Sequence, residues 1–237
     1  MSKIVILTGA GISAESGIET FRAEDGLWAQ HRVEDVATPE GFARDPELVV
    51  NFYNARRAQL AEVDANAAHR ALARLEANHD GEVIVITQNV DDLHERGGSQ
   101  TVMHMHGELK SALCAACEQR WTAPLVMAPG DTCPSCKSPA ARPDIVWFGE
   151  MPYDMDTLSD HLSQADIFVA IGTSGNVYPA AGFVAEARRA GAHTIEFNLE
   201  RSAIGSQFEE HRTGPASQTV TAWVEEILNP ADVRGIF

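Results

Sequence analysis

A short apolar segment near the start of the chain runs directly into a glycine-rich turn. The segment is Ile4–Leu7, and Gly9, Gly11 and Ala14 follow it in the pattern G-x-G-x-x-A. An apolar, β-branched run closed by glycines is typical of a buried parallel strand. Gly9 permits a tight turn, Gly11 permits close approach of a pyrophosphate, and Ala14 lets a helix pack close to the sheet. The segment predicts a dinucleotide-binding unit; the alternative is a turn whose glycines serve only the backbone.

One element of an ordinary dehydrogenase is missing downstream of this turn. About 20 residues further on, such enzymes place a ribose-binding acid at the end of a second strand. Here the chain continues through the polar stretch Thr20–Trp28, which contains Phe21 and Arg22 and has no strand signal. The sequence therefore argues against simple hydride transfer.

Further strands and helices alternate along the chain. We expect strands over Val83–Ile86, Asp166–Ile171 and Thr194–Phe197, an extended segment over Val102–Leu109, and helices over Asp45–Glu62, Asn66–Ala77, Ala180–Ala190 and Ala216–Leu228. This alternation predicts an α/β fold with a Rossmann-like parallel sheet and helices on both faces. The strands end in small or polar residues, and the carboxyl ends of parallel strands form the ligand crevice of such sheets.

The charge balance limits the possible partners. The chain has 18 basic and 34 acidic residues among 237, a net charge of -16. This acidity disfavours nucleic acid and anionic membranes as partners, because both require a basic surface. No apolar stretch reaches the roughly 18 residues of a membrane helix, and Ile4–Leu7 is too short for a signal peptide. We expect a cytoplasmic protein.

All four cysteines lie in one Cys- and Pro-rich segment that interrupts the α/β pattern. Their spacing is C-x2-C-x15-C-x2-C, at Cys114, Cys117, Cys133 and Cys136. Two such pairs predict a tetrahedral all-thiolate zinc site, in which no open position remains for water. We therefore expect one structural zinc per chain. The alternatives, two disulfides or four idle thiols, are disfavoured in a reducing compartment.

Two histidines, His104 and His106, are candidates for the catalytic base. Histidine titrates near physiological pH and is the most common general base. On an extended strand the two would face the same side and could also bind a metal. Spacing alone does not choose between them. His69 and His94 fall on expected helices, where a structural role is favoured.

Taken together, the motifs resemble those of the sirtuin family. They are GAGIS-x3-GI-x2-FR at Gly9–Arg22, TQNVD-x-LH-x2-GG at Thr87–Gly98, HGEL at His106–Leu109, the paired CxxC motifs, PDIVWFGE at Pro143–Glu150, GTSGNVYPAA at Gly172–Ala181 and FNLE at Phe197–Glu200. The match follows the family order over nearly the whole chain. The resemblance implies an NAD-dependent protein-lysine deacylase that consumes NAD by cleaving its nicotinamide bond.

The resemblance also implies a domain organisation. Residues 1–30, 82–110 and 143–237 would form a Rossmann-like NAD-binding domain. A helical module, residues 31–81, and a zinc-binding module, residues 111–142, would form a small domain.

Site residues follow from the same resemblance. His106 would be the catalytic base, with Asn89 and Asp91 beside it in the nicotinamide pocket. Residues expected to bind NAD are Gly9, Ala10, Gly11, Ile12, Ser13, Phe21, Arg22, Gln88, Asn89, Asp91, Gly172, Thr173, Ser174, Asn198, Leu199, Glu200 and Ala216. Residues expected to bind the substrate peptide as an added strand are Val146, Phe148, Gly149, Glu150 and Val177.

The acyl group is suggested by Tyr53 and Arg56, which are three residues apart and share one helix face. A buried Tyr and a surface Arg are common in any helix. Their position, however, resembles the class III, desuccinylase-type branch of the family, including bacterial CobB-type enzymes. A guanidinium binds a carboxylate bidentately and a phenol adds one hydrogen bond. We expect removal of succinyl, malonyl and acetyl groups, with nicotinamide and O-acyl-ADP-ribose as products.

Three competing functions are considered. A zinc-ribbon protein that binds nucleic acid conflicts with the charge of -16. A conventional NAD dehydrogenase lacks the ribose-binding acid. Within the family, a protein mono-ADP-ribosyltransferase is the alternative to a deacylase.

Overall fold

The computed structural model describes residues 2–18 and 31–229. Its centre is a parallel sheet of six strands in the order β3-β2-β1-β7-β8-β9. The strands are β1 (Ile4–Thr8), β2 (Val83–Thr87), β3 (Val102–His104), β7 (Ile167–Ile171), β8 (His193–Asn198) and β9 (Glu210–Thr213). From β1 the chain adds strands first on one side and then, from β7 onward, on the other. This reversal places a switch point at the carboxyl ends of β1 and β7, the region where open α/β sheets bind their ligands, and we refer to this region as the crevice.

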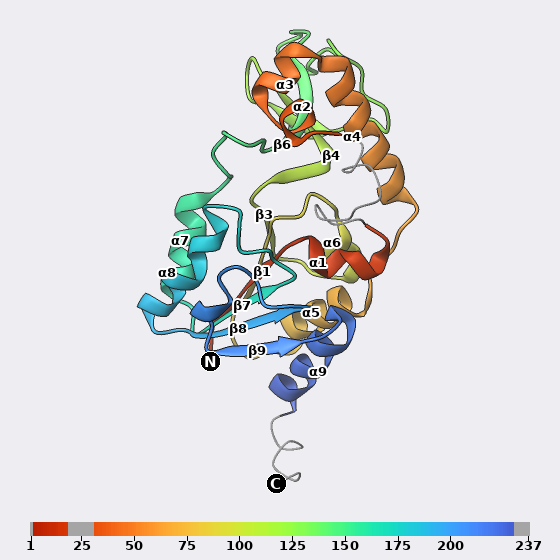
Figure 1. Ribbon diagram of the computed structural model, residues 1–237. Coiled ribbons are helices and arrows are strands. Elements are labelled where there is room, and N and C mark those ends of the chain that lie inside the picture. Colours follow the sequence, from red (N-terminus) through yellow and green to blue (C-terminus); the bar gives the residue numbers. More distant parts are fainter. Residues whose placement is uncertain (1, 19–30, 230–237) are drawn as a thin grey trace.

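Helices cover both faces of this sheet, which confirms the predicted fold class (Figure 1). Ile4 and Ile6 of β1 point to one face, where they pack with α5 (Ala67–Asn78) and α9 (Ala216–Leu228). Val5 and Leu7 point to the other face, toward α7 (Met155–Ser163) and α8 (Phe183–Ala190). Alternation along a strand directs neighbouring side chains to opposite faces, so a fully apolar β1 needs two helical layers.

Polar caps fix the starts of two of the helices that the sequence predicts. The side chain of Asp45 accepts a hydrogen bond from the Leu48 N–H at 2.9 Å, at the start of α4 (Pro46–Ala61). The side chain of Asn66 accepts one from the Ala68 N–H at 2.9 Å, at the start of α5. Such caps satisfy backbone donors that have no partner inside the helix. The predicted helix over Ala180–Ala190 forms as the 3-10 turn η2 (Ala180–Gly182) followed by α8.

A second sheet lies beyond the carboxyl end of β1, at the top of Figure 1. It is antiparallel, in the order β5-β4-β6, with β4 (Gly107–Cys114), β5 (Arg120–Thr122) and β6 (Ala141–Ile145). The helices α2 (Val33–Val36), α3 (Pro39–Arg44) and α4 accompany it. Their shared core includes Val49, Phe52, Tyr53, Leu109, Ile145 and Trp147. We refer to this sheet and these helices as the small lobe.

The remaining short elements are connections around the crevice. They are α1 (Ala10–Ser13), η1 (Ala14–Ser16), α6 (Leu93–Gly97) and η3 (Gly205–Gln207). Among the described residues, no helix combines the length and the apolar character needed to span a bilayer.

The structure differs from the expected segment boundaries in two places. Helix α5 lies within the range 31–81 but packs on the six-stranded sheet through Ala68, Leu72 and Leu75. The predicted extended segment Val102–Leu109 is interrupted, because the chain turns at Met105 and His106 between β3 and β4. The prediction of one continuous strand with both histidines on one side is therefore wrong.

Candidate active site

Three glycines bring the turns after β1 and β7 into backbone contact. The Gly9 N–H donates to the Ile171 carbonyl at 3.0 Å, and the Gly11 N–H donates to the Gly172 carbonyl at 2.9 Å. A Cβ on Gly11 would lie 2.6 Å from the Gly172 Cα, and Gly172 has φ +63°. Only residues without a side chain fit this approach. The glycines thus build the floor of the crevice.

This contact corrects two details of the sequence interpretation. Ala14 is exposed, so it does not provide a close helix-to-sheet contact; that contact is made by Gly11 and Gly172. The Gly11 N–H is also already bonded to protein. The Ala10 N–H, by contrast, has no acceptor among the described residues and is available to an anionic ligand.

A buried polar network joins the ends of β1 and β2. The side-chain amide of Asn89 donates to the Gly9 carbonyl at 3.2 Å and to Ser13 Oγ at 3.1 Å. Ser13 Oγ in turn donates to Asp91 Oδ2 at 3.1 Å. Burial raises the pKa of Asp91, opposed by hydrogen bonds from the Leu93 N–H and from Ser13. Asn89, Asp91 and Ser13, three residues expected at the nicotinamide and ribose, are therefore held together.

Two buried histidines, His69 and His94, lie beside this network. His69 Nδ1 accepts from the Asn66 N–H at 3.3 Å, so its other nitrogen carries the proton and faces Ser13 Oγ at 3.5 Å. His94 Nε2 lies 2.9 Å from Thr8 Oγ1. Burial lowers the pKa of both rings, that of His69 to about 4. Both are neutral and structural, in agreement with the sequence interpretation.

The residues expected around the adenosine half gather at the ends of β7, β8 and β9. The Asn198 side-chain amide donates to the Thr173 carbonyl at 2.8 Å, and the Asn198 carbonyl accepts from the Gly214 N–H at 3.1 Å. Ala216, two residues after Gly214, is the first residue of α9. Leu199 is 65% exposed, and Glu200 is exposed as well. Ser174 Oγ accepts from the Asn176 N–H at 3.3 Å within its own loop. Phe21 and Arg22 lie outside the described residues.

His106 and His104 have different surroundings, and these separate their roles. His106 Nδ1 lies 3.1 Å from the Gln88 carbonyl oxygen. A carbonyl only accepts, so Nδ1 carries the proton and Nε2 keeps its lone pair. Burial lowers the pKa of His106 below its ordinary value. A half-buried neutral imidazole with an unprotonated nitrogen is suited to be a general base.

Both ring nitrogens of His104 face oxygen atoms instead. Nδ1 lies 3.3 Å from the Asn89 carbonyl and Nε2 lies 2.7 Å from Glu95 Oε1. Burial alone lowers the pKa of His104, but the bond and charge of Glu95 outweigh it and raise that pKa. Both nitrogens of this ring are thus engaged with protein oxygens, and among the described residues no cluster of candidate metal ligands includes His104 or His106.

Tyr53 and Arg56 lie on the face of α4 that is turned toward the crevice residues. Tyr53 is 1% exposed, and burial raises the pKa of its hydroxyl to about 12. The Arg56 guanidinium carbon lies 5.9 Å from the ring centres of both Tyr53 and Phe52. Burial lowers the pKa of Arg56, opposed by the nearby charges of Tyr53 and Asp91. The electrostatic attraction between Arg56 and Asp91 shows that Arg56 lies near the Asn89–Ser13–Asp91 network.

Four of the five expected peptide-binding residues follow β6, and Val177 lies in the loop before η2. Phe148 is 49% exposed and Gly149 is exposed, whereas Val146 and Val177 are half-buried. The Glu150 carboxylate is bound by Arg142 at 2.7 and 2.9 Å. It also accepts from the Trp147 N–H at 2.8 Å. The Glu150 side chain therefore shapes this segment from inside. Trp147, within the same motif, is 2% exposed and packs into the core of the small lobe.

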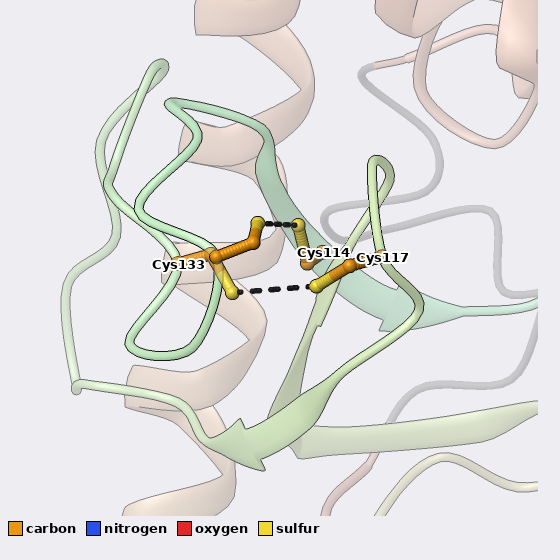
Figure 2. Close-up of side chains that lie close together, drawn as sticks. Cys114, Cys117 and Cys133 are labelled. Carbon is orange, nitrogen blue, oxygen red and sulfur yellow. Dashed lines mark hydrogen bonds between the residues drawn. The ribbon is translucent and has the colours of Figure 1, made fainter.

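The four cysteines come together at the far end of the small lobe. Cys114, Cys117 and Cys133 point into a common space in Figure 2, and all four ligand sulfurs lie within 4.8 Å of one another. The Cys114–Cys136 and Cys117–Cys133 sulfurs are 3.6 and 3.7 Å apart. A tetrahedral zinc with bonds of about 2.3 Å places its sulfurs about 3.8 Å apart. The Ala116 and Ser135 N–H groups each approach a cysteine sulfur at 3.4 Å, as suits a thiolate. The cluster fits a zinc ion.

The fold has two defining features: a parallel sheet with close glycine contacts at its switch point, and a small lobe with a four-cysteine cluster. Together they define the class of nucleotide-binding α/β proteins that carry a metal-binding module. Comparison with known proteins narrows this class. The model of the Sir2 family matches residues 9–179. The chain belongs to the Sir2 family, the sirtuins, as the motifs predicted.

Curated relatives and solved structures agree on this family. The NAD-dependent protein deacylase of Vibrio cholerae is 60% identical over 228 residues, covering 95% of this chain and 93% of the relative. That of Salmonella typhimurium is 58% identical over 231 residues, covering 95% and 84%. A mutant Sir2 homologue in complex with ADP-ribose superposes with a TM-score of 0.89 at 38% identity, covering 98% of this chain and 94% of that one. A Sir2 protein bound to acetylated peptide has a TM-score of 0.81 at 30% identity, covering 94% and 92%.

Proposed function

We propose that this sirtuin removes acyl groups from protein lysines with NAD as co-substrate, and that it prefers acyl groups that end in a carboxylate. The enzyme is an NAD-dependent protein deacylase, the name that its relatives at 58–60% identity carry. The observation that carries the proposal is the crevice itself. There Asn89, Asp91 and the Gln88–His106 pair lie at the ends of neighbouring strands.

The residues of the crevice support a division of roles. Ala10, Ser13, Thr173 and Asn198 bind the phosphates and the two riboses, and Asn89 and Asp91 line the nicotinamide pocket. In the proposed reaction the acyl oxygen of the lysine replaces nicotinamide at the ribose carbon. His106 Nε2 then accepts a proton from a ribose hydroxyl, which attacks the acyl carbon. The bond from that carbon to the lysine nitrogen breaks, lysine leaves as the free amine, and water supplies the oxygen that completes the ester of O-acyl-ADP-ribose. Holding the reactants in contact supplies much of the rate, and general base catalysis adds roughly 10²–10⁴-fold.

The preference for an acidic acyl group rests on Tyr53 and Arg56. An arginine remains charged at physiological pH, and a Tyr53 hydroxyl with a pKa of about 12 remains a donor. A distal carboxylate of succinyl- or malonyl-lysine can bind both groups. An acetyl group has no such charge, so it gains nothing from Arg56.

The test compares kcat/KM for a succinyl and an acetyl peptide of one sequence, in wild type and in Arg56→Met. A charge-assisted hydrogen bond is worth about 1.5–3 kcal/mol, so we expect the succinyl-to-acetyl ratio to fall by about 10- to 100-fold. Mass spectrometry of the reaction tests whether nicotinamide and O-acyl-ADP-ribose are the products. Arg57→Met is the matched control, because Arg57 points away and binds the Leu125 and Leu109 carbonyls at 3.3 and 3.2 Å. An unchanged ratio in Arg56→Met contradicts the acyl preference.

A further inference from the structure

Trp147 is held rigidly from two sides at the end of β6. Its side chain is 2% exposed. The Arg142 guanidinium carbon lies 3.5 Å from the ring centre, and Arg142 is itself held by the Glu150 carboxylate. That carboxylate also accepts from the Trp147 N–H at 2.8 Å. A buried, stacked and backbone-anchored indole has little freedom to rotate, so the direction of its own N–H group is fixed.

That N–H group points at Tyr53. The distance from Trp147 Nε1 to Tyr53 Oη is 3.1 Å. An indole nitrogen only donates, so the Tyr53 oxygen is the acceptor. Because one lone pair is occupied, the hydroxyl proton of Tyr53 turns away from the indole. A hydroxyl that accepts one hydrogen bond also donates a stronger one. Among the described residues, the structure gives this proton no acceptor.

Tyr53 lies beside Arg56, the other residue proposed to bind the acyl carboxylate. Tyr53 and Arg56 are on one face of α4, and the guanidinium carbon lies 5.9 Å from the tyrosine ring centre. We propose that Trp147 is a positioning residue for acyl specificity, whose indole N–H orients the Tyr53 hydroxyl toward the carboxylate of an acidic acyl-lysine. This inference rests on the acyl preference proposed above.

The experiment measures kcat and KM for succinyl and acetyl peptides in Trp147→Phe. The substitution removes the donor and keeps an aromatic ring. We expect the succinyl kcat/KM to fall by about threefold to tenfold, the range for one neutral hydrogen bond, mainly through KM. The acetyl kcat/KM should stay within about twofold, because an acetyl group has no distal carboxylate for the Tyr53 hydroxyl to bind. Trp121→Phe, a half-buried tryptophan on β5 of the same lobe, is the matched control.

A double-mutant cycle with Tyr53→Phe separates positioning from a general loss of structure. If Trp147 acts through the tyrosine hydroxyl, Trp147→Phe has no further effect on succinyl KM in the Tyr53→Phe background. Benzothienylalanine at position 147 is a second variant that keeps the shape of indole and carries sulfur in place of the N–H group. It reproduces the expected loss even where Trp147→Phe folds poorly.

The outcomes are distinguishable. Equal losses for both acyl groups, or losses that add in the cycle, overturn the role of Trp147. If Arg56→Met and Tyr53→Phe lower the succinyl-to-acetyl ratio while both position-147 variants leave it unchanged, the acyl preference stands and this inference fails. If Arg56→Met also leaves the ratio unchanged, the acyl preference itself fails.

Discussion

His106 donates from Nδ1 to the carbonyl oxygen of Gln88 across 3.1 Å, and this single bond determines which nitrogen can act as a base. Gln88 follows β2 and His106 follows β3, so the bond depends on the pairing of two neighbouring strands. Backbone geometry therefore sets the tautomer of the proposed catalytic residue.

The first prediction concerns the pH dependence of His106. Burial lowers the pKa of this imidazole below its ordinary 6.5, and only the neutral ring accepts a proton. We expect the acid limb of the kcat/KM profile to have its midpoint below pH 6.5. His106→Ala should lose roughly 10²–10⁴-fold in kcat and keep its fold and metal. A pH–rate profile and circular dichroism check both statements; an active His106→Ala enzyme contradicts the assignment.

The second prediction concerns metal binding by the four cysteines. Purified protein should contain about one zinc per chain, because the sulfur separations of 3.6 and 3.7 Å fit a closed tetrahedral site. Cys133→Ser should lose the metal and destabilise the small lobe. Elemental analysis and thermal unfolding provide the measurements. A metal-free protein with an unchanged unfolding temperature would show that the cluster is not a zinc site.

The third prediction concerns the glycine contact under the crevice. A Cβ on Gly172 would lie 2.5 Å from the Ile12 nitrogen, and the residue has φ +63°. The left-handed backbone alone costs about 1–2 kcal/mol for another residue, and the backbone clash adds to it. Gly172→Ala should therefore lower the free energy of unfolding by more than about 2 kcal/mol and weaken NAD binding.

The control for this variant is Gly182→Ala, since a Cβ there meets nothing within 4 Å. Urea denaturation and NAD titration compare the two proteins. Equal stability of the two alanine variants would contradict the proposed close contact.

The fourth prediction concerns stability in acid. Burial lowers the pKa of His69 to about 4, whereas the unfolded chain has the ordinary value of 6.5. Between these two pH values the unfolded state binds more protons than the folded state, so the free energy of unfolding increases as the pH rises. The contribution of His69 is fully present above about pH 6.5 and decreases as the pH falls toward 4, by about 3 kcal/mol in total. His94 acts in the same direction.

Denaturation with urea at about pH 5 and pH 7 tests this dependence. His69→Gln should reduce the difference between the two conditions, because glutamine does not titrate. A wild-type protein as stable in mild acid as at neutral pH would argue against a buried neutral His69.

Local patterns made several elements predictable. Asp45-Pro46 and Asn66 carry the signals for the starts of α4 and α5, and Gly214-Pro215 precedes α9. The apolar run Ile4–Leu7 requires cover on both faces, which implies the α/β class. These signals are readable because they depend on residues close together in the sequence.

Long-range contacts determined the rest. Spacing could not choose between His104 and His106, because the difference lies in Glu95 and Gln88, which reach them from other elements. Ala14 could not be excluded as a packing residue until the turn after β7 placed Gly172 against Gly11. The α5 helix lies on the sheet because its apolar stripe meets β1, a contact that no local pattern specifies.

The sequence by itself determined the family, the set of cysteines that form one cluster and the starts of the main helices, because motifs and caps depend on residues close together in the sequence. Only the tertiary structure decided which imidazole nitrogen is free, which glycines touch and which tryptophan directs the Tyr53 hydroxyl. Each of these depends on atoms from segments far apart in the chain, and their separation is set by the packing of the whole fold.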